Sequence, residues 1–236
     1  LDTGMDLVKL AQDKGVKLAV NQNARWAPYF AFMREAARAG HIGQVLSVHL
    51  NVHWNHGWTA GTPFDEIEDL ILYDFGVHWF DFVNSVLGDR VESVFATALR
   101  GAGQANKVPL LAQAMVRADG AQASLVFDGG IPHGPRDTTF LGGTAGSIQS
   151  DGPDLSQQRV TMTTPDGIAR PTLEGQWFND GFMGTMGELL CAIEDDREPS
   201  NGAAENLRSL AMAFAAVRSR MTGKEVAVGA ARRLES

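Results

Sequence analysis

The first part of the chain alternates between helical and strand-like patterns of apolar residues. Apolar positions at helical spacing predict a helix over residues 4–14, and Gly15 suits the turn that ends it. The apolar run 16–20 then predicts a short buried strand. A helix, a glycine and a buried strand form half of an α/β unit, without the half that should precede it.

The next segments predict a second helix and a longer strand. Pro28 suits the first turn of a helix that ends before Gly40. Residues 44–54 alternate between polar and apolar side chains, as a strand with one buried face does. Residues 67–87 are strongly apolar and predict one continuous helix that Gly88 ends.

The middle of the chain changes character. Short β-like runs recur, and Gly, Asp and Pro separate them as in an antiparallel sheet. These runs are 91–99, 110–118, 121–127, 137–141, 147–149 and 158–163. Two amphipathic helices follow, at 179–196 and 203–222, and a closing strand is expected near Val226. Helices around a large, mainly antiparallel sheet define an α+β fold.

Composition narrows the classes of function. The 236 residues carry 20 Lys and Arg against 28 Asp and Glu, a net charge of −8, which argues against a general binder of nucleic acid or anionic membranes. No apolar run approaches the roughly 20 residues that span a bilayer. The single Cys191 fits a reducing compartment, and we expect a cytoplasmic location. The chain starts at Leu1 with no signal peptide, so we interpret it as an internal fragment or a processed product.

One stretch combines two groups capable of acid/base chemistry. Asp74 and His78 are four residues apart, so on a helix they share a face. A carboxylate one turn from an imidazole can orient the ring and favour its protonated form, and histidine is the most common general acid or base. The alternative interpretation is a satisfied Asp–His helix pair at the edge of the core.

Two glycine-rich stretches imitate nucleotide-binding loops. Gly101-Ala102-Gly103 follows a predicted strand, but the residues after it open no helix, as a dinucleotide fingerprint requires. Residues 142–146 lack the Lys-Ser/Thr ending of a P-loop. Both are predicted to be turns between strands.

Several ordered pieces of the chain resemble the Gfo/Idh/MocA family of NAD(P)-dependent dehydrogenases, and together they cover nearly its whole length. The pieces that carry the resemblance are Gly15-Val16-Lys17-Leu18-Ala19-Val20, Asn23-Ala24-Arg25-Trp26 with Pro28, Gly40-His41-Ile42-Gly43-Gln44-Val45, Asp74-x-x-x-His78-x-x-Asp81, Leu87-Gly88, Val91-Glu92-Ser93-Val94, Gly142 to Ile148, Trp177, Phe182, Ala211 to Ser219 and Gly223-Lys224-x-Val226.

This resemblance implies an organisation and a chemistry. Residues 1–22 would be the last piece of a dinucleotide-binding (Rossmann) domain, and residues 23–236 a catalytic, substrate-binding and oligomerisation domain. Asp74 and His78 match two members of the family's catalytic set, with His78 as general acid/base and Asp74 orienting it. The third member, a lysine, and the glycine-rich phosphate loop would lie before Leu1. The resemblance thus implies NAD or NADP bound largely upstream, a sugar or polyol substrate, and a homo-oligomer formed through the sheet.

Other polar and aromatic residues are candidates for the pocket. His53 and Asn55 end a predicted strand where the family places contacts to substrate hydroxyls, although His53 on a strand could equally face solvent. His133 lies in a glycine- and proline-rich loop and is equally an ordinary surface histidine. Arg25 could bind substrate or brace the domain junction. Trp54 and Trp58 offer rings on which sugars stack.

Asn23 is a candidate for contact with the cofactor. A metal site at His53 and His56 is disfavoured, because two histidines with no further ligand nearby form a weak motif.

Three functional hypotheses therefore stand. The first is the catalytic half of a dehydrogenase that oxidises a secondary hydroxyl, inactive without its cofactor domain. The second is a non-catalytic ligand-binding or dimerisation module. The third is a lyase or hydrolase of the same family with a self-recycling NAD step.

Overall fold

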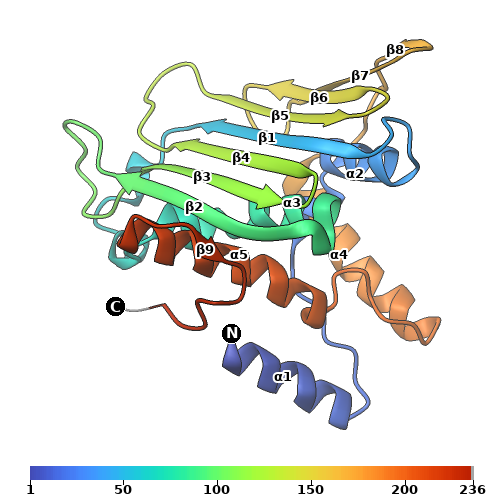
Figure 1. Cartoon of the computed structure of the whole chain (residues 1–236), viewed down its shortest axis with the longest axis horizontal. Helices are drawn as coiled ribbons and strands as arrows, with labels where there is room; N and C mark the ends of the chain where they lie inside the picture. The colour runs from blue at the N-terminus through green and yellow to red at the C-terminus, as the bar shows by residue number, and fades with distance from the viewer. Residues whose placement is uncertain (235–236) are drawn as a thin grey trace.

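The computed structural model describes residues 1–234. Within them one open sheet of nine strands forms the body of the molecule, in the order β8-β7-β6-β5-β1-β4-β3-β2-β9 (Figure 1). The central pair, β1 and β4, is parallel, and the other pairings are antiparallel. The strands are β1 (Val45–His53), β2 (Val91–Leu99), β3 (Leu111–Ala118), β4 (Ala121–Asp128), β5 (Arg136–Gly143), β6 (Ser147–Gly152), β7 (Arg159–Thr164), β8 (Gly167–Ala169) and β9 (Val226–Ala227).

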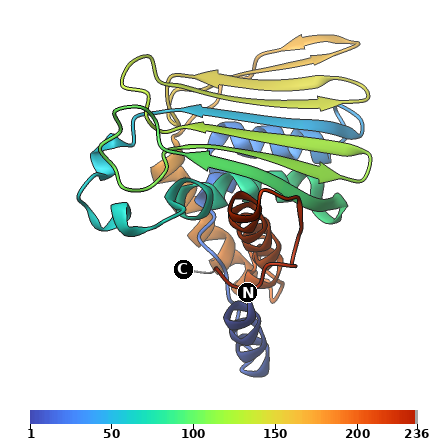
Figure 2. The same cartoon turned by 60° about the vertical axis from the view of Figure 1, so that its left-hand side comes forward.

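The helices gather on one side of this sheet and leave its other face open (Figures 1 and 2). Helix α5 packs on β2 and on α3, whereas α1 lies apart from the sheet, beyond α5. The helices are α1 (Asp2–Asp13), α2 (Pro28–Arg38), α3 (Val77–Leu87), α4 (Trp177–Glu194) and α5 (Ala203–Thr222).

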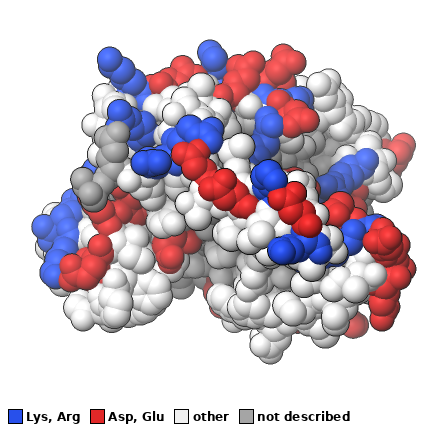
Figure 3. Space-filling model, turned by 90° about the horizontal axis from the view of Figure 1, so that it is seen from below, with Lys and Arg blue, Asp and Glu red and all other residues white. Residues whose placement is uncertain are grey.

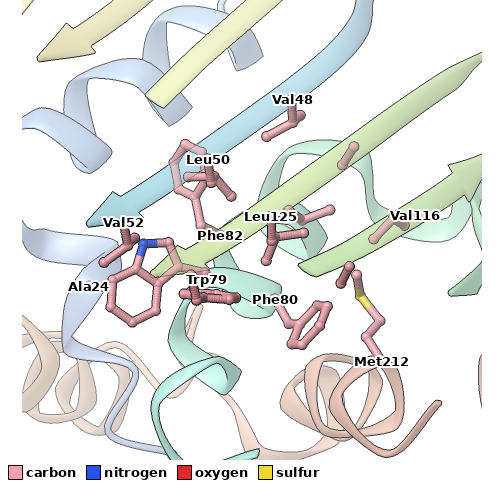
Figure 4. Close-up of a cluster of buried hydrophobic side chains, with 14 of the residues drawn as sticks. Ala24, Val48, Leu50, Val52, Trp79, Phe80, Phe82, Val116, Leu125 and Met212 are labelled. Carbon is pink, nitrogen blue, oxygen red and sulfur yellow. The ribbon is translucent and has the colours of Figure 1, made fainter. Parts of the chain in front are cut away.

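The core fills the space between the helices and the covered face of the sheet. Leu50 of β1 and Leu125 of β4 point toward α3 and α5, where Phe80 and Met212 meet them (Figure 4). Burying each such side chain contributes about 1.5–3 kcal/mol. Because side chains alternate along a strand, His49, Asn51 and His53 of β1 point to the open face instead.

The predicted α+β architecture is confirmed, and most elements fall within a few residues of their predicted bounds. The glycine-rich stretches are turns, one between β2 and β3 and the other between β5 and β6. The predicted strand over residues 16–20 is wrong. Only Ala19 forms a bridge, to Gly202, and Val16 is 58% exposed. The short β8 was not predicted.

The predicted continuous helix over 67–87 is also wrong in its first half. A π-helical turn occupies Ile71–Phe75, and α3 begins only at Val77. The N–H of Gly76 donates to the carbonyl of Ile71, five residues earlier, which is the hydrogen bond of a π-helix. A Cβ at Gly76 would lie 2.6 Å from that carbonyl oxygen, so a glycine is required for the close approach.

Charges of both signs are interspersed on the face in Figure 3, with uncharged areas between them. No helix in the part of the chain that the structure describes is both long and apolar enough to cross a membrane.

Candidate active site

A pocket of about 750 Å³ opens on the helix-covered side, beside the end of β1 and the start of α3. Its walls come from the segment before α2, the loop after β1, the π-turn with α3, the loop after β6 and the start of α4. The lining residues are Asn23, Trp54, Asn55, His56, Trp58, Phe64, Asp74, Phe75, His78, Trp79, Pro135, Pro153, Asp154, Leu155, Ser156, Gln157, Trp177 and Phe178.

His78 is held by a residue from a distant part of the chain. Its Nδ1 lies 2.9 Å from the Oε1 of Gln22, which is buried. Because a carboxamide oxygen only accepts hydrogen bonds, Nδ1 carries the proton and donates it. Nε2 then keeps its lone pair, which is the form that a general base needs.

The electrostatic surroundings also favour neutral His78. Burial lowers the pKa of the imidazole below its ordinary value, and the charges of Asp81 and Asp74 oppose this shift. The ring is therefore unprotonated near neutral pH and can take up a proton there.

Asp74 lies on the π-turn, half-buried, on the same pocket wall as His78. Burial raises the pKa of its carboxyl group, and the charge of His78 partly offsets this. Among residues 1–234 the ring nitrogen of His78 bonds to Gln22, and no hydrogen bond joins it to Asp74. Gln22 is thus the hydrogen-bond partner of the ring, the charge of Asp74 acts on it, and the orienting role expected for Asp74 stays a prediction.

The other predicted residues divide into two groups. Asn23, Trp54, Asn55 and Trp58 line the pocket together with Asp74 and His78. The Oδ1 of Asn23 accepts a hydrogen bond from the Nε1 of Trp177 at 3.0 Å. Contact of the first four with substrate or cofactor stays a prediction.

Arg25, by contrast, is a bracing residue. Its guanidinium is 3% exposed and binds the carboxylate of Asp81 through two hydrogen bonds of 2.7 and 2.9 Å. A third bond, to the carbonyl of Ser200, ties this pair to the loop between α4 and α5. The guanidinium has no free edge toward the pocket, so of the two predicted roles the structure fits the bracing one.

His53 and His133 do not join the pocket. His53 points to the open face of the sheet, where its Nδ1 lies 2.7 Å from Asp128 Oδ2. His133 is exposed on the loop before β5. His53 lies on the open face of the sheet, whereas His56 lines the pocket. Among the residues that the structure describes, no group of three or more His, Cys, Asp or Glu could hold a metal ion.

Sequence reasoning missed several lining residues, among them the aromatic residues Phe64, Phe75, Trp79, Trp177 and Phe178. Ring contacts connect Trp177, Trp79, Trp54 and His56 in series, with centroids 5.5–5.7 Å apart. His56 then stacks on Phe75 at 4.6 Å. The cluster of aromatic residues between 54 and 80 was the available signal for this wall. Nothing in the local sequence identified Gln22.

A family model described as the GFO/IDH/MocA C-terminal domain matches residues 30–149. Among curated proteins, the chain is 26% identical over 230 residues to an inositol 2-dehydrogenase of Rhizobium meliloti, covering 94% of this chain and 68% of that protein. It is 24% identical to a D-apiose dehydrogenase of Rhizobium rhizogenes, covering 95% of this chain and 68% of that protein.

Solved structures share the fold. An oxidoreductase from Agrobacterium radiobacter, in complex with NAD⁺, L-tartaric acid and magnesium, superposes with a TM-score of 0.84 at 22% identity, over 96% of this chain and 69% of that one. A levoglucosan dehydrogenase in complex with NADH and L-sorbose superposes with a TM-score of 0.79 at 17% identity, over 96% of this chain and 70% of that one.

Proposed function

The chain belongs to the GFO/IDH/MocA family, and from this premise we propose that it is the substrate-binding and catalytic half of a nicotinamide-dependent oxidoreductase. The proposed reaction oxidises a secondary hydroxyl of a sugar or polyol. The observation that carries the proposal is His78, held by Gln22 with a free Nε2 in a large pocket. The similarity to inositol and D-apiose dehydrogenases supports the substrate class.

In this proposal His78 is the general base. Nε2 accepts the proton of the substrate hydroxyl while the carbon atom that carries this hydroxyl is oxidised. The proton leaves a positive charge on the ring, which the nearby carboxylates of Asp74 and Asp81 stabilise. Gln22 keeps its hydrogen bond to Nδ1 throughout, because Nδ1 carries a proton in both charge states.

The pocket fits the nicotinamide end of a cofactor. Asn23 and Trp177 are joined on one wall, and the 54%-exposed ring of Phe178 lies next to Trp177, with centroids 6.3 Å apart. A carboxamide near one exposed aromatic face suits a flat, amide-bearing ring, so Asn23 and Phe178 would hold it, with the buried Trp177 fixing Asn23. When bound, NAD or NADP would take up the hydride. The rest of the cofactor site is proposed to lie before residue 1, as the family resemblance implies, and this chain covers 68% of the inositol 2-dehydrogenase that it matches.

Two organisational proposals accompany this function. Residues 1–22, with α1 apart from the sheet, would end a dinucleotide-binding domain, and residues 23–236 would form the catalytic domain. The open face of the sheet would form a homo-oligomer interface, since it carries exposed apolar side chains such as Leu46 and Met115.

A reduction assay tests the reaction class. The full-length enzyme that carries this chain is incubated with NAD⁺ or NADP⁺ and a panel of sugars and polyols, and absorbance of the reduced cofactor is followed. We expect accumulation of reduced cofactor with at least one substrate. Substrate conversion without accumulation of reduced cofactor would instead favour the lyase or hydrolase hypothesis. Binding of a sugar or polyol without its conversion would favour a non-catalytic module.

A further inference from the structure

The outer wall of the pocket is built from two exposed aromatic rings. Trp58 and Phe64 come from the loop 55–66 and meet edge to face, with centroids 5.6 Å apart. They are 58% and 36% exposed, although both rings line a concave site. Phe64 in turn approaches Phe75, at 6.1 Å, on the π-turn that carries Asp74.

Buried polar contacts hold this wall in place. Thr59, fully buried, accepts a hydrogen bond of 2.7 Å from the amide of Asn106. Asp65, 3% exposed, accepts hydrogen bonds from the backbone N–H groups of Gly61 and Lys107 at 3.1 and 2.8 Å. The loop that carries both rings is therefore held in place, which lowers the entropic cost of binding a ligand against them.

Two polar side chains beside the outer pocket already accept hydrogen bonds within the protein. The side-chain oxygen of Asn55 accepts the N–H of Gly57 at 2.8 Å. On the opposite wall, Asp154 Oδ1 accepts the N–H groups of Ser156 and Gln157 at 2.8 and 2.9 Å. These oxygens offer less to the hydroxyls of a second sugar ring, whereas an aromatic group needs no hydrogen bonds and can pack on the two exposed rings.

The charge of the lining residues of this chain disfavours an anionic group in the outer pocket. None of the lining residues is a lysine or arginine. His56 supplies no cation, because burial lowers its pKa to about 4. Asp74 and Asp154 are acidic, so a phosphate or carboxylate would meet repulsion here.

We propose that the substrate is a neutral sugar or polyol that carries an aromatic group, with its hydroxyl-bearing end at His78 and its aromatic ring against Trp58 and Phe64. The proposal rests on the proposed function for the inner end, whereas the outer end can be tested by binding alone. An aromatic ring packs on such faces edge to face or offset, needs no hydrogen bonds and covers the exposed rings.

Binding of matched glycoside pairs to the chain tests this proposal. Calorimetric titration compares phenyl with methyl glycosides of glucose, galactose and xylose, so that only the aromatic group differs within a pair. In at least one pair we expect the phenyl member to bind about tenfold more tightly or better. Trp58→Ala and Phe64→Ala should bring that ratio close to one. Phe140→Ala, equally exposed on the open face of the sheet, should leave it unchanged.

Three results would overturn the proposal: no binding by any pair, equal binding within every pair, or a ratio that Trp58→Ala leaves intact. Circular dichroism of each variant confirms that it is folded, and the wild-type comparison does not depend on any variant. A preserved phenyl preference without cofactor reduction in the full-length enzyme would contradict the proposed function and leave the aromatic subsite standing.

Discussion

The Nδ1 of His78 lies 2.9 Å from the Oε1 of Gln22, across 56 positions of sequence. Gln22 is 3% exposed and belongs to the segment just before α2, so a rigid part of the fold fixes the ring. The contact assigns the proton of the neutral imidazole to Nδ1 and leaves Nε2 as the only basic nitrogen. Gln22 is thus a positioning residue for the proposed base.

Replacing Gln22 should affect kcat more than KM. Gln22→Met keeps the length of the side chain but removes the acceptor, so the ring can adopt the wrong tautomer, and we expect kcat to fall about 10–100-fold. Gln22→Glu keeps an acceptor and adds negative charge, which raises the pKa of His78.

The pH profile separates this role from a merely structural one. The proposed base works unprotonated, so activity is lost as pH falls through the pKa of His78, which burial places below 6.5. Asp74 and Asp81 are the charged groups that act on this ring. In Gln22→Glu the acid limb of kcat/KM should move to higher pH. An unmoved limb, with kcat unchanged in Gln22→Met, would contradict the assignment.

Gly76 should be intolerant of a side chain. Gly76→Ala places a Cβ within 2.6–2.7 Å of the carbonyl oxygens of Ile71 and Leu72, so the π-turn must shift. We expect unfolding free energy to fall by about 1–3 kcal/mol. Gly187→Ala, on helix α4 with nothing within 4 Å of the new methyl group, should be neutral or stabilise by less than about 1 kcal/mol. Chemical denaturation of both variants measures the contrast, and equal effects would refute the steric argument.

The buried pair of Arg25 and Asp81 should matter for stability. Arg25→Met leaves the carboxylate of Asp81 buried with its charge unpaired, and such losses cost about 3–5 kcal/mol. Adding Asp81→Asn removes the stranded charge, so the double variant should recover part of the loss. Urea unfolding of the two single variants and the double variant tests this. Additive losses would mean that the two side chains are not coupled.

Asp137 of β5 should make stability depend on pH. The carboxyl group is fully buried, and within residues 1–234 neither oxygen has a hydrogen-bond partner. Burial, with the charges of Asp154 and Asp151, raises its pKa from 3.8 to about 7. The native state therefore binds the proton more tightly than the unfolded state, and this stabilisation, full below about pH 4, is lost as pH rises through about 7.

Asp137→Asn removes that titration. The unfolding free energy of the variant relative to wild type should increase between about pH 4.5 and about pH 8, by about 3 kcal/mol. Denaturation curves of both proteins at the two pH values measure it. A difference that does not vary with pH would show that Asp137 keeps an ordinary pKa.

The strand and turn pattern of the sheet could be predicted because it is local. Alternation fixed β1 and β3 within a residue of their bounds, and glycines marked the turns. The same alternation places His53 with His49 and Asn51, on the face opposite Leu50. The absence of His53 from the pocket could therefore have been predicted from the sequence. The strand predicted over residues 16–20 was wrong because strand pairing is not local. An apolar run favours an extended backbone, but it does not show whether a neighbouring strand is present to pair with it.

The site was only partly predictable. The spacing of Asp74 and His78 identified two residues on the same pocket wall, but it assumed an α-helix, and the π-turn ending at Phe75 was not visible in the pattern. Gln22 could not be found, because its contact with His78 depends on tertiary packing between distant segments.

The most direct test of the account is the substitution of His78 in the full-length enzyme. His78→Gln should lower kcat/KM for cofactor reduction by about 10²–10⁴-fold, the usual contribution of a general base. His41→Gln, at an exposed histidine outside the pocket, serves as the control and should retain wild-type kinetics. A folded His78→Gln enzyme with unchanged kcat/KM would contradict the assignment of His78 as the base.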